Sequence, residues 1–422
     1  MMNFSKLKNR MHNQLVIDKR LKVVCLWYLL FLMISVRKHS LRAAADFSGL
    51  ATSQFSRFLK NHPDVAVYNL DQLSKKQAKQ FCAALKSLAK RQLPWKVAIL
   101  IDSTIEHRSS LHTDNVKRFN HGKGFQIGHQ WTNVVLIIND KLIPLPPIPF
   151  YTKSYCRKHN LAYQTENALV VQYIDQINLK DYIGAHQPEQ VIVLADSGYD
   201  DRKIQKAIIK KKWHFIIALN KRRSVKSTKH YLSTPRSKGW SHVAQLFKNH
   251  RSVKWQTILI ATNRSKKKRM EFRIRQINGY LRYVGNVQLV CSQFKKRPKG
   301  RKKYLACSDL NAKARQIIIG YRMRWRIEIF HKEIKMFLGF EDVATKWFSS
   351  VMAHVHWVYC VYILLNLKDI EVPKKLKSLA EKQHWITKII ENKEKSRVLQ
   401  LLTRINGAQH FKTELQSALQ TV

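Results

Sequence analysis

Four side chains that could bind a phosphate backbone beside a metal ion lie in one short stretch, YRMRWRIEIFHKEIK. The stretch is predicted to be helical, because it contains no Gly or Pro and its apolar residues recur at steps of three and four. At about 100° per residue, its phenol, guanidinium, carboxylate and ammonium groups fall within roughly 60° of each other on one helix face. These groups belong to Tyr321, Arg324, Glu328 and Lys335.

The second acid of this stretch, Glu333, lies roughly 120° from Tyr321 by the same count. Glu328 is therefore the carboxylate expected to share the basic face. An ordinary solvated face, with opposite charges paired four residues apart, would contain the same residue types. Spacing alone leaves both interpretations open.

Two further candidate acids each follow an apolar run that is predicted to be a β-strand. Asp102 ends the run KVAILID and Asp196 ends QVIVLAD. An Asp after a strand is often only a turn residue or a helix cap. Phosphodiester cleavage commonly uses two Mg²⁺ ions, however, and three carboxylates from separate elements can hold such hard cations. Asp102, Asp196 and Glu328 are therefore the predicted catalytic and metal-binding residues.

The composition favours a polyanionic partner. Lys plus Arg number 77 against 27 Asp plus Glu, a formal net charge of +50, and nucleic acid is the usual counterpart of such a charge. An anionic membrane surface is the competing interpretation. The apolar runs Val23–Val36 and Val351–Leu365 are shorter than the roughly 20 residues that span a bilayer, so both are predicted to be buried helices. The basic residues also spread over several elements, not one amphipathic helix, which disfavours the membrane.

The cysteines and the N-terminus indicate a reducing compartment. The six cysteines form no CxxC pair, so structural zinc is not expected and ordinary thiols are. The opening MMNFSKLKNR leads into polar residues, not into an apolar core with a small-residue cleavage site. A cytoplasmic protein without a signal peptide is expected.

The segment 1–92 is predicted to be a helical DNA-binding domain. Within it, 39–62 has the pattern of a helix-turn-helix, with Ala45 packed between the helices and Gly49 in the turn. The second helix is expected to begin near Thr52, whose side chain can cap it. Two-helix corners of this kind also occur in proteins that do not bind DNA. The residues predicted to face DNA are Ser53, Gln54, Arg57 and Lys60.

The segments 93–220 and 304–368 are predicted to be the two parts of an α/β core. The order of the first part is three strands, a helix, a strand, a short basic helix and a strand. This order is typical of a ribonuclease-H-like fold, in which acids at strand ends meet at one edge of the sheet. The C-terminal segment 369–422 is predicted to be a helical tail. The predicted strands are 96–102, 131–139, 142–150, 190–196 and 213–220, with a turn at Asp140-Lys141, and the predicted helices are 165–183 and 202–211.

The segment 221–303 is predicted to be a basic, β-rich insertion domain. It holds 25 Lys or Arg and one acid, Glu271, a net charge of 25 − 1 = +24. Basic blocks are often disordered. Here β-type runs and aromatic residues lie between the basic clusters, which favours a folded module that follows a DNA strand. Trp240 and Trp255 are the aromatic candidates for stacking on a base.

The chain resembles the bacterial insertion-sequence transposases of the Asp-Asp-Glu (DDE) class, the insertion-sequence family four type. Its helix stretch matches the Y-x2-R-x3-E-x6-K signature of that family, and this four-point match is specific. Asp196-Ser197-Gly198-Tyr199 matches the D-x-G-Y motif around the second aspartate, and Asp102-Ser103-Thr104 resembles the end of the first-aspartate strand. The resemblance covers about residues 95–340, including the long β-rich insertion.

This resemblance implies a cut-and-paste mechanism in a bacterial, nucleoid-associated enzyme. Asp102, Asp196 and Glu328 would bind two Mg²⁺ ions, for which Mn²⁺ could substitute. Tyr321, Arg324 and Lys335 would hold phosphates of the transposon end. Relatives act on terminal inverted repeats and target DNA in a paired-end complex, usually as homodimers. Excision in relatives passes through a DNA hairpin with a flipped base stacked on a Trp of the insertion, and Trp240 and Trp255 both remain candidates.

Two other functions are compatible with the same residues. The first is a metal-dependent nuclease on the same ribonuclease-H-like core, without strand transfer. The second is a non-catalytic basic DNA-binding relative, although the presence of all three acids counts against it.

Overall fold

The structure is a computed structural model of the chain, and it contains two compact units. The helical unit comprises Met1–Asn69, Glu333–Ala344 and Ser349–Val422, and the sheet unit comprises Leu70–Lys332 and Thr345–Phe348. Among the described residues, no helix is both long and apolar enough to cross a membrane. The residues that the structure describes are 2–120, 124–233, 238–249, 253–262, 265–295 and 302–405.

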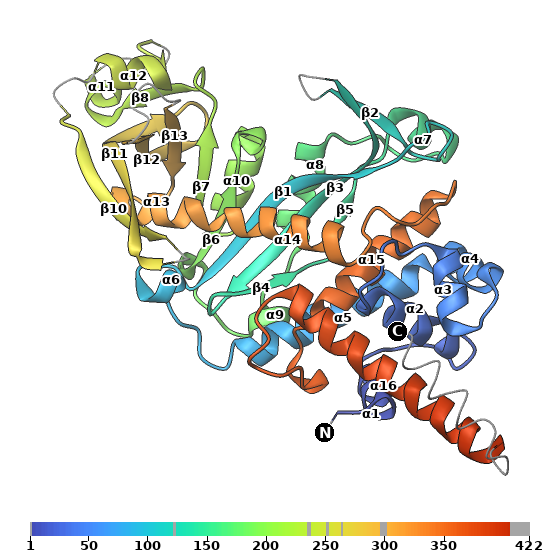
Figure 1. Ribbon diagram of the computed structural model, residues 1–422. Coiled ribbons are helices and arrows are strands. Elements are labelled where there is room, and N and C mark those ends of the chain that lie inside the picture. The colour runs from blue at the N-terminus through green and yellow to red at the C-terminus, as the bar shows by residue number, and fades with distance from the viewer. Residues whose placement is uncertain are drawn as a thin grey trace. The chain divides into compact units, whose positions relative to one another are not determined.

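The sheet unit is built on one mixed sheet, which has thirteen strands within the described residues (Figure 1). In its centre β1 runs parallel to β6, β6 runs parallel to β7, and β3 pairs with β1 in the antiparallel sense. The strand order is β2-β3-β1-β6-β7-β13-β12-β11-β8-β9, with β10 on β11 and with β4 and β5 on β3. The strands of the first half are β1 (Val97–His107), β2 (Lys117–Asn120), β3 (Phe125–Ile138), β4 (Lys141–Pro144), β5 (Ile148–Pro149), β6 (Val191–Ala195) and β7 (His214–Leu219).

The predicted insertion does not form a separate sheet. Strand β13 pairs with β7 in the antiparallel sense, so the strands after β7 extend the central sheet on one side. The longest is β11 (Ser265–Leu281), which pairs with both β12 and β10. The other elements of this region are β8 (Ser224–Ser227), α11 (Thr228–Ser233), β9 (Ser241–His242), α12 (Val243–Asn249), β10 (Gln256–Thr262), β12 (Gly285–Phe294) and β13 (Lys303–Cys307).

The two faces of β1 contact different helices, because successive side chains of a strand point to opposite faces. Val97, Ile99 and Ile101 belong to the core cluster that also contains buried residues of α8 and α10. Asp102 therefore points to the opposite face. The remaining helical elements of the sheet unit are α6 (Leu88–Arg91), α7 (Lys153–Lys158), α8 (Glu166–Gln176), α9 (Lys180–Ile183), η1 (Pro188–Gln190), η2 (Ser197–Tyr199), α10 (Arg202–Lys210) and α13 (Ala314–Met323).

Several boundaries differ from the sequence predictions. Strands β1 and β3 are longer than predicted, and the turn that joins β3 to β4 is Asn139-Asp140, where both residues have positive φ angles of 49° and 58°. The run 142–150 divides into two short strands, since its prolines have no N–H group to donate to a neighbouring strand. The predicted helix 165–183 is interrupted after Gln176, giving α8 and α9.

The helical unit begins with four helices. In the pair formed by α3 and α4, Gly49 has a left-handed φ of 74° and its N–H donates to the Ala45 oxygen at 2.9 Å. The buried alanine of α3 is Ala44, not Ala45, which is only half-buried. Helix α4 begins at Thr52, as predicted. Its N-terminus is capped not by the Thr52 side chain but by that of Gln54, which accepts from the Ala51 N–H at 3.0 Å. The helices that lie wholly or mainly in this unit are α1 (Phe4–His12), α2 (Lys22–Met33), α3 (Leu41–Ser48), α4 (Thr52–Asn61), α15 (Phe348–Leu364), η3 (Lys368–Ile370) and α16 (Leu379–Ile405). Two further helices are divided between the two units, α5 (Pro63–Phe81) and α14 (Trp325–Phe337).

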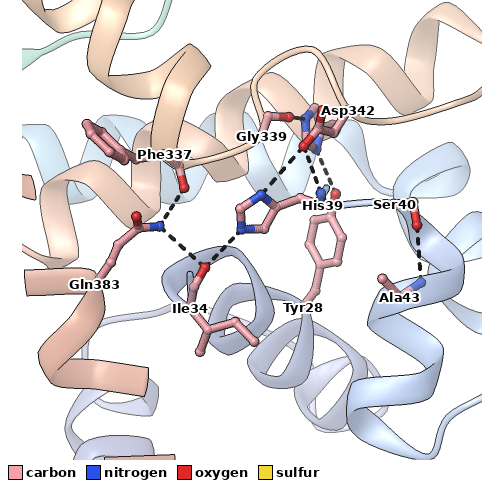
Figure 2. A network of polar contacts seen from close by, with 10 residues as sticks. Tyr28, Ile34, His39, Ser40, Ala43, Phe337, Gly339, Asp342 and Gln383 are labelled. Atoms are coloured by element: carbon pink, nitrogen blue, oxygen red, sulfur yellow. Dashed lines mark hydrogen bonds and ion pairs between the residues drawn. The ribbon is translucent and has the colours of Figure 1, made fainter. Parts of the chain in front are cut away.

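A buried polar network joins α2, α15 and the turn after α14 inside the helical unit (Figure 2). The Tyr28 hydroxyl donates to Nδ1 of His354 at 2.7 Å, and Nε2 of His354 donates to the Gly339 oxygen at 2.8 Å. The backbone N–H of His39 donates to Asp342 at 2.7 Å, and its ring donates to the Ile34 oxygen at 3.1 Å. These hydrogen bonds link α2 and the segment after it to α15 and to the turn after α14.

Candidate active site

Two of the predicted acids lie where the parallel pairing of two neighbouring strands ends. Strands β1 and β6 are in register from Val97 opposite Val191 to Ile101 opposite Ala195, and Asp102 and Asp196 each come one residue later. Asp196 follows the end of β6, as predicted, whereas Asp102 lies within β1, which continues to His107 because its pairing with β3 extends that far. Asp196 also begins the short turn η2, where its Oδ1 accepts from the Gly198 N–H at 2.7 Å.

The third acid, Glu328, lies in the first turn of α14. The stretch that carries it is not the single helix that the sequence predicts, because α13 ends at Met323 and α14 starts at Trp325. At the junction, the Arg324 N–H donates to the Tyr321 oxygen at 3.1 Å, and the Ile327 N–H donates to the Arg324 oxygen at 3.0 Å. These hydrogen bonds span three residues where an α-helix spans four, so the turn is tighter there.

Arg324 links two of the acids. Its Nη1 contacts Oδ2 of Asp102 at 3.0 Å, and its Nη2 contacts Oε1 of Glu328. The side chains are largely withdrawn from solvent, with exposed fractions of 13% for Arg324, 15% for Asp102 and 28% for Glu328. Low exposure strengthens the attraction between these charges but also adds a desolvation cost.

The charges of the cluster act on each other strongly enough to shift a pKa. Burial is the main cause that raises the pKa of Asp102 to about 7; the negative charges of Asp196 and Glu328 act in the same direction, and the charge of Arg324 opposes them. Burial also raises the pKa of Tyr321, whose hydroxyl is influenced by Arg324 and by Asp196 and Asp102. The structure therefore brings Tyr321, Arg324 and the three acids into one electrostatic cluster.

The profile of the transposase DDE domain matches residues 96–364, well over half of the chain. This chain belongs to the DDE transposase family. No curated protein matches it. The matched segment contains Asp102, Asp196 and the junction between α13 and α14.

Lys335 and Glu333 of the transposase lie on the part of α14 that belongs to the helical unit. The Lys335 ammonium pairs with Glu341 at 2.8 Å. The Glu333 carboxylate accepts from the Tyr362 hydroxyl at 3.5 Å, and burial raises its pKa. Glu333 thus has a partner of its own within the helical unit.

The transposase contains a polar network that the sequence did not reveal, on the face of the sheet opposite Asp102. Glu166, in the first turn of α8, accepts from the Tyr199 hydroxyl at 2.7 Å and from Thr132 Oγ1 at 3.0 Å through its Oε1. Its Oε2 accepts from Gln130 Nε2 at 2.6 Å. Tyr199 is the last residue of the D-x-G-Y motif and lies three residues after Asp196. The network therefore ties the Asp196 turn to β3.

A second contact fastens α14 to β3 on the Asp102 side. Asn133 is directly opposite Asp102 in the β1–β3 ladder. Its side-chain nitrogen contacts Nε2 of the buried His331 at 2.8 Å, and His331 lies on α14 three residues after Glu328. Arg326 adds a hydrogen bond from Nη2 to the Asp140 oxygen at 2.8 Å. The helix that carries Glu328 is thus held against the strand that pairs with β1.

The predicted DNA-binding residues outside this cluster occupy two other places. In the insertion, the half-buried Trp240 has Lys226 Nζ 5.1 Å from its ring centre, and Trp255 has the Arg275 guanidinium at 4.7 Å. In the helical unit, Arg57 and Lys60 are exposed on α4. A pocket beside that helix is lined by charged, polar and apolar side chains, among them Arg20, Val24, Gln54, Arg57, Phe58 and His62.

Proposed function

We propose that this chain is the transposase of an insertion sequence, which binds the terminal inverted repeats of its element, cuts the DNA and joins the ends to a target. The observation that supports this most directly is the cluster of Asp102, Asp196 and Glu328 around Arg324. Three carboxylates from two neighbouring strands and one helix are the set expected for phosphoryl transfer. The family supplies the transposase assignment, and the cut-and-paste chemistry is the proposal.

The arrangement of the central strands supports a ribonuclease-H-like core. The order β3-β1-β6-β7, with β3 antiparallel and the other three parallel, is the one expected for such a core. Acids at the ends of adjacent parallel strands then meet at a single sheet edge. A helix that crosses this edge can add the third acid.

The residues of the cluster fit a pair of hard divalent cations by their chemistry. All three acids offer only oxygen donors, which Mg²⁺ and Mn²⁺ prefer. The raised pKa of Asp102 reflects its burial first and the charges of Asp196 and Glu328 second, and a bound cation would favour the charged carboxylate. The described residues contain no group of three His, Cys, Asp or Glu side chains already arranged around a metal position. Asp102 and Glu328 instead hold Arg324, so metal binding requires the guanidinium to release them.

Bound Mg²⁺ would activate the attacking water or hydroxyl and stabilise the leaving oxygen. The released Arg324 would then be free to bind a phosphate of the transposon end, together with Tyr321 and Lys335. Trp240 and Trp255 would stack on an unpaired base, since the exposed cations Arg282 and Lys302 lie 6.0 Å and 5.8 Å from their ring centres and can hold the adjoining phosphates. Arg57 and Lys60 would contact the terminal repeat, and the enzyme would act as a homodimer on two paired ends.

The test is cleavage of a duplex that carries the DNA flanking the coding region, with Mg²⁺ present. Asp102→Asn, Asp196→Asn and Glu328→Gln each keep the side-chain size and remove one charge, and each should lower cleavage at least 1000-fold, roughly the loss seen for essential catalytic groups. Glu189→Gln is the matched control, since Glu189 is exposed just before β6. Cleavage at the wild-type rate by any of the three variants would remove that residue from the site.

A second assay separates a transposase from a nuclease. Pre-cut ends are supplied together with a supercoiled target plasmid, and joined products are measured. A nuclease that lacks strand transfer would cut the intact ends and leave the plasmid unjoined.

A further inference from the structure

A two-stranded arm extends from the sheet beyond the candidate active site. It consists of β2 and the first part of β3, which pair from Lys117 opposite Gly128 to Asn120 opposite Phe125. Figure 1 shows this pair of strands projecting past the end of β1. Neither the acid cluster nor the family signature gives this arm a role.

The arm is cationic and carries exposed aromatic surface. Lys117 and Arg118 are exposed, and Phe125 has an exposed fraction of 57%. The Arg118 guanidinium lies 4.3 Å from the centre of the Phe125 ring. Residues 115–139 include no Asp or Glu, so the arm supplies no acid of its own to neutralise these cations. Such a surface is complementary to a polyanion.

The base of the arm is held rigidly. Glu106 is fully buried and contacts both Arg108 and Nδ1 of His129, the latter at 2.7 Å. The ring nitrogen Nε2 of His129 donates to the Asp114 oxygen at 2.8 Å. At Gly128 a Cβ atom would lie 2.1 Å from the Glu106 oxygen, so the strands approach more closely than any other residue permits. Buried charges require well-placed partners, and this cluster therefore fixes the register in which the arm leaves the sheet.

The reach of the arm follows from the strand register. Asp102 is opposite Asn133, and Phe125 lies eight residues earlier along the same strand β3. At about 3.3 Å per residue this places Phe125 roughly 26 Å along the strand from the acid. The same length of duplex contains about 8 base pairs, which is less than one helical turn. A duplex cut at Asp102 and running beside β3 would therefore meet the arm.

We propose that the β2–β3 arm is a clamp for duplex DNA of the transposon end, within one helical turn of the cut. Lys117 and Arg118 bind phosphates, and Phe125 packs against the sugars of the groove into which the arm fits, since a two-stranded ribbon has the width of a DNA groove. The inference rests on the proposed function, because a clamp needs a DNA substrate. Its register with Asp102 lets the arm set the distance between the cut and the duplex it holds.

The test compares a double variant of the arm with a charge-matched control. Lys117→Ala/Arg118→Ala removes two exposed cations from the arm, and Lys388→Ala/Lys395→Ala removes two exposed cations from α16. The probe is a fluorescein-labelled duplex of about four helical turns that carries the flanking DNA. Its affinity is measured by anisotropy over a series of KCl concentrations. The arm variant should bind about tenfold more weakly and should lower the slope of log K against log salt by about 2, because two phosphate contacts are lost.

Hydroxyl-radical footprinting locates the effect on the DNA. The arm variant should lose protection about 8 base pairs from the cut and keep protection at the cut itself. Phe125→Ala should weaken the same protection with little change in the salt slope, because it removes no charge. Should the double alanine variant fold poorly by circular dichroism, Lys117→Gln and Arg118→Gln replace it as single changes.

The outcomes separate this inference from the proposed function. If the wild-type protein neither binds nor cuts the duplex, the proposed function fails. If it does both and the arm variant matches the α16 control in affinity, slope and footprint, the clamp is wrong and the proposed function stands. A change of sedimentation coefficient in the arm variant, with DNA binding intact, would assign the arm to contact between copies of the chain and would also overturn the clamp.

Discussion

Each of the two units contains a cluster of buried polar side chains. The clusters differ in how completely hydrogen bonds and opposite charges compensate the buried groups. In the helical unit, His39 donates both its backbone N–H and its ring N–H, and His354 is bonded on both ring nitrogens. Burial alone would raise the pKa of Asp342, but the hydrogen bonds and charge of His39 hold it below its usual value. The fold therefore stabilises the charged form of this carboxyl.

In the cluster of the sheet unit, by contrast, the charged form of a carboxyl is disfavoured. Asp102 has a raised pKa although Arg324 is bonded to it, because burial and two like charges outweigh one cation. The Arg324 Nε is buried and has no hydrogen-bond partner among the described residues. A group whose charged form is disfavoured costs stability, and such groups gather where binding or catalysis needs them. The helical-unit network therefore stabilises the charge that it buries, whereas the acid cluster leaves its buried charge only partly compensated.

The largest effect is expected from Asp102→Asn, which should separate stability from activity. Cleavage should fall at least 1000-fold, yet the metal-free protein should melt on the order of 2 °C higher at pH 8. The sign follows from the raised pKa: the native state holds its proton more tightly, so stability falls as pH rises from 3.8 through about 7. Removing the carboxylate removes that loss. Differential scanning calorimetry in EDTA measures the melting temperature. A lower melting temperature than that of the wild type at pH 8 would contradict the proposed destabilisation by the buried carboxylate.

The next largest effect is expected in the hydrogen-bonded cluster of the helical unit. Gly339 has a φ of 66°, and a Cβ there would lie 2.5 Å from Cβ of His39. Gly339→Ala should therefore lower the free energy of unfolding by at least about 2 kcal/mol, from both backbone strain and the clash. Gly49→Ala is the control, since its φ of 74° is similar but no atom lies within 4 Å, and it should cost about 1 kcal/mol. Equal losses in urea denaturation would show that contact with His39 adds nothing.

A smaller effect should come from Glu166→Gln. The amide keeps the size of the side chain but cannot accept from Tyr199, Thr132 and Gln130 together. A slightly displaced Asp196 turn should lower kcat about tenfold while DNA affinity stays unchanged, since Glu166 acts through Tyr199. Single-turnover cleavage and anisotropy measure the two quantities separately, with Glu189→Gln as the control. An equal loss in affinity and rate would indicate a general structural role.

The sequence predicts the parts of this arrangement that are local. An apolar run that ends in an acid is visible in one stretch, so the strand segments that lead to Asp102 and Asp196 could be placed without the structure. The strand end before Asp196 agrees with the prediction, whereas β1 continues past Asp102 to His107, because its pairing with β3 extends that far. The partners of Glu166 are 33 to 36 residues away in the chain, and nothing in its neighbourhood signals them. The break at Arg324 was also hidden, because helix propensity is continuous there and the tight turn coincides with an ion pair to Asp102, which is far away in the chain. Tertiary contacts decide both features.

The smallest effect tests the helical unit through its pH dependence. Burial lowers the pKa of His356 on α15 to about 4, although a hydrogen bond to the Met352 oxygen opposes this. A lowered histidine pKa means that the unfolded chain takes up the proton first, so stability should fall as pH drops from 6.5 towards 4. Between pH 7 and 5.5 this amounts to about 1 kcal/mol. His356→Gln should remove that part of the slope in urea denaturation at the two pH values. An unchanged slope in the variant would assign the pH dependence to other groups of the unit.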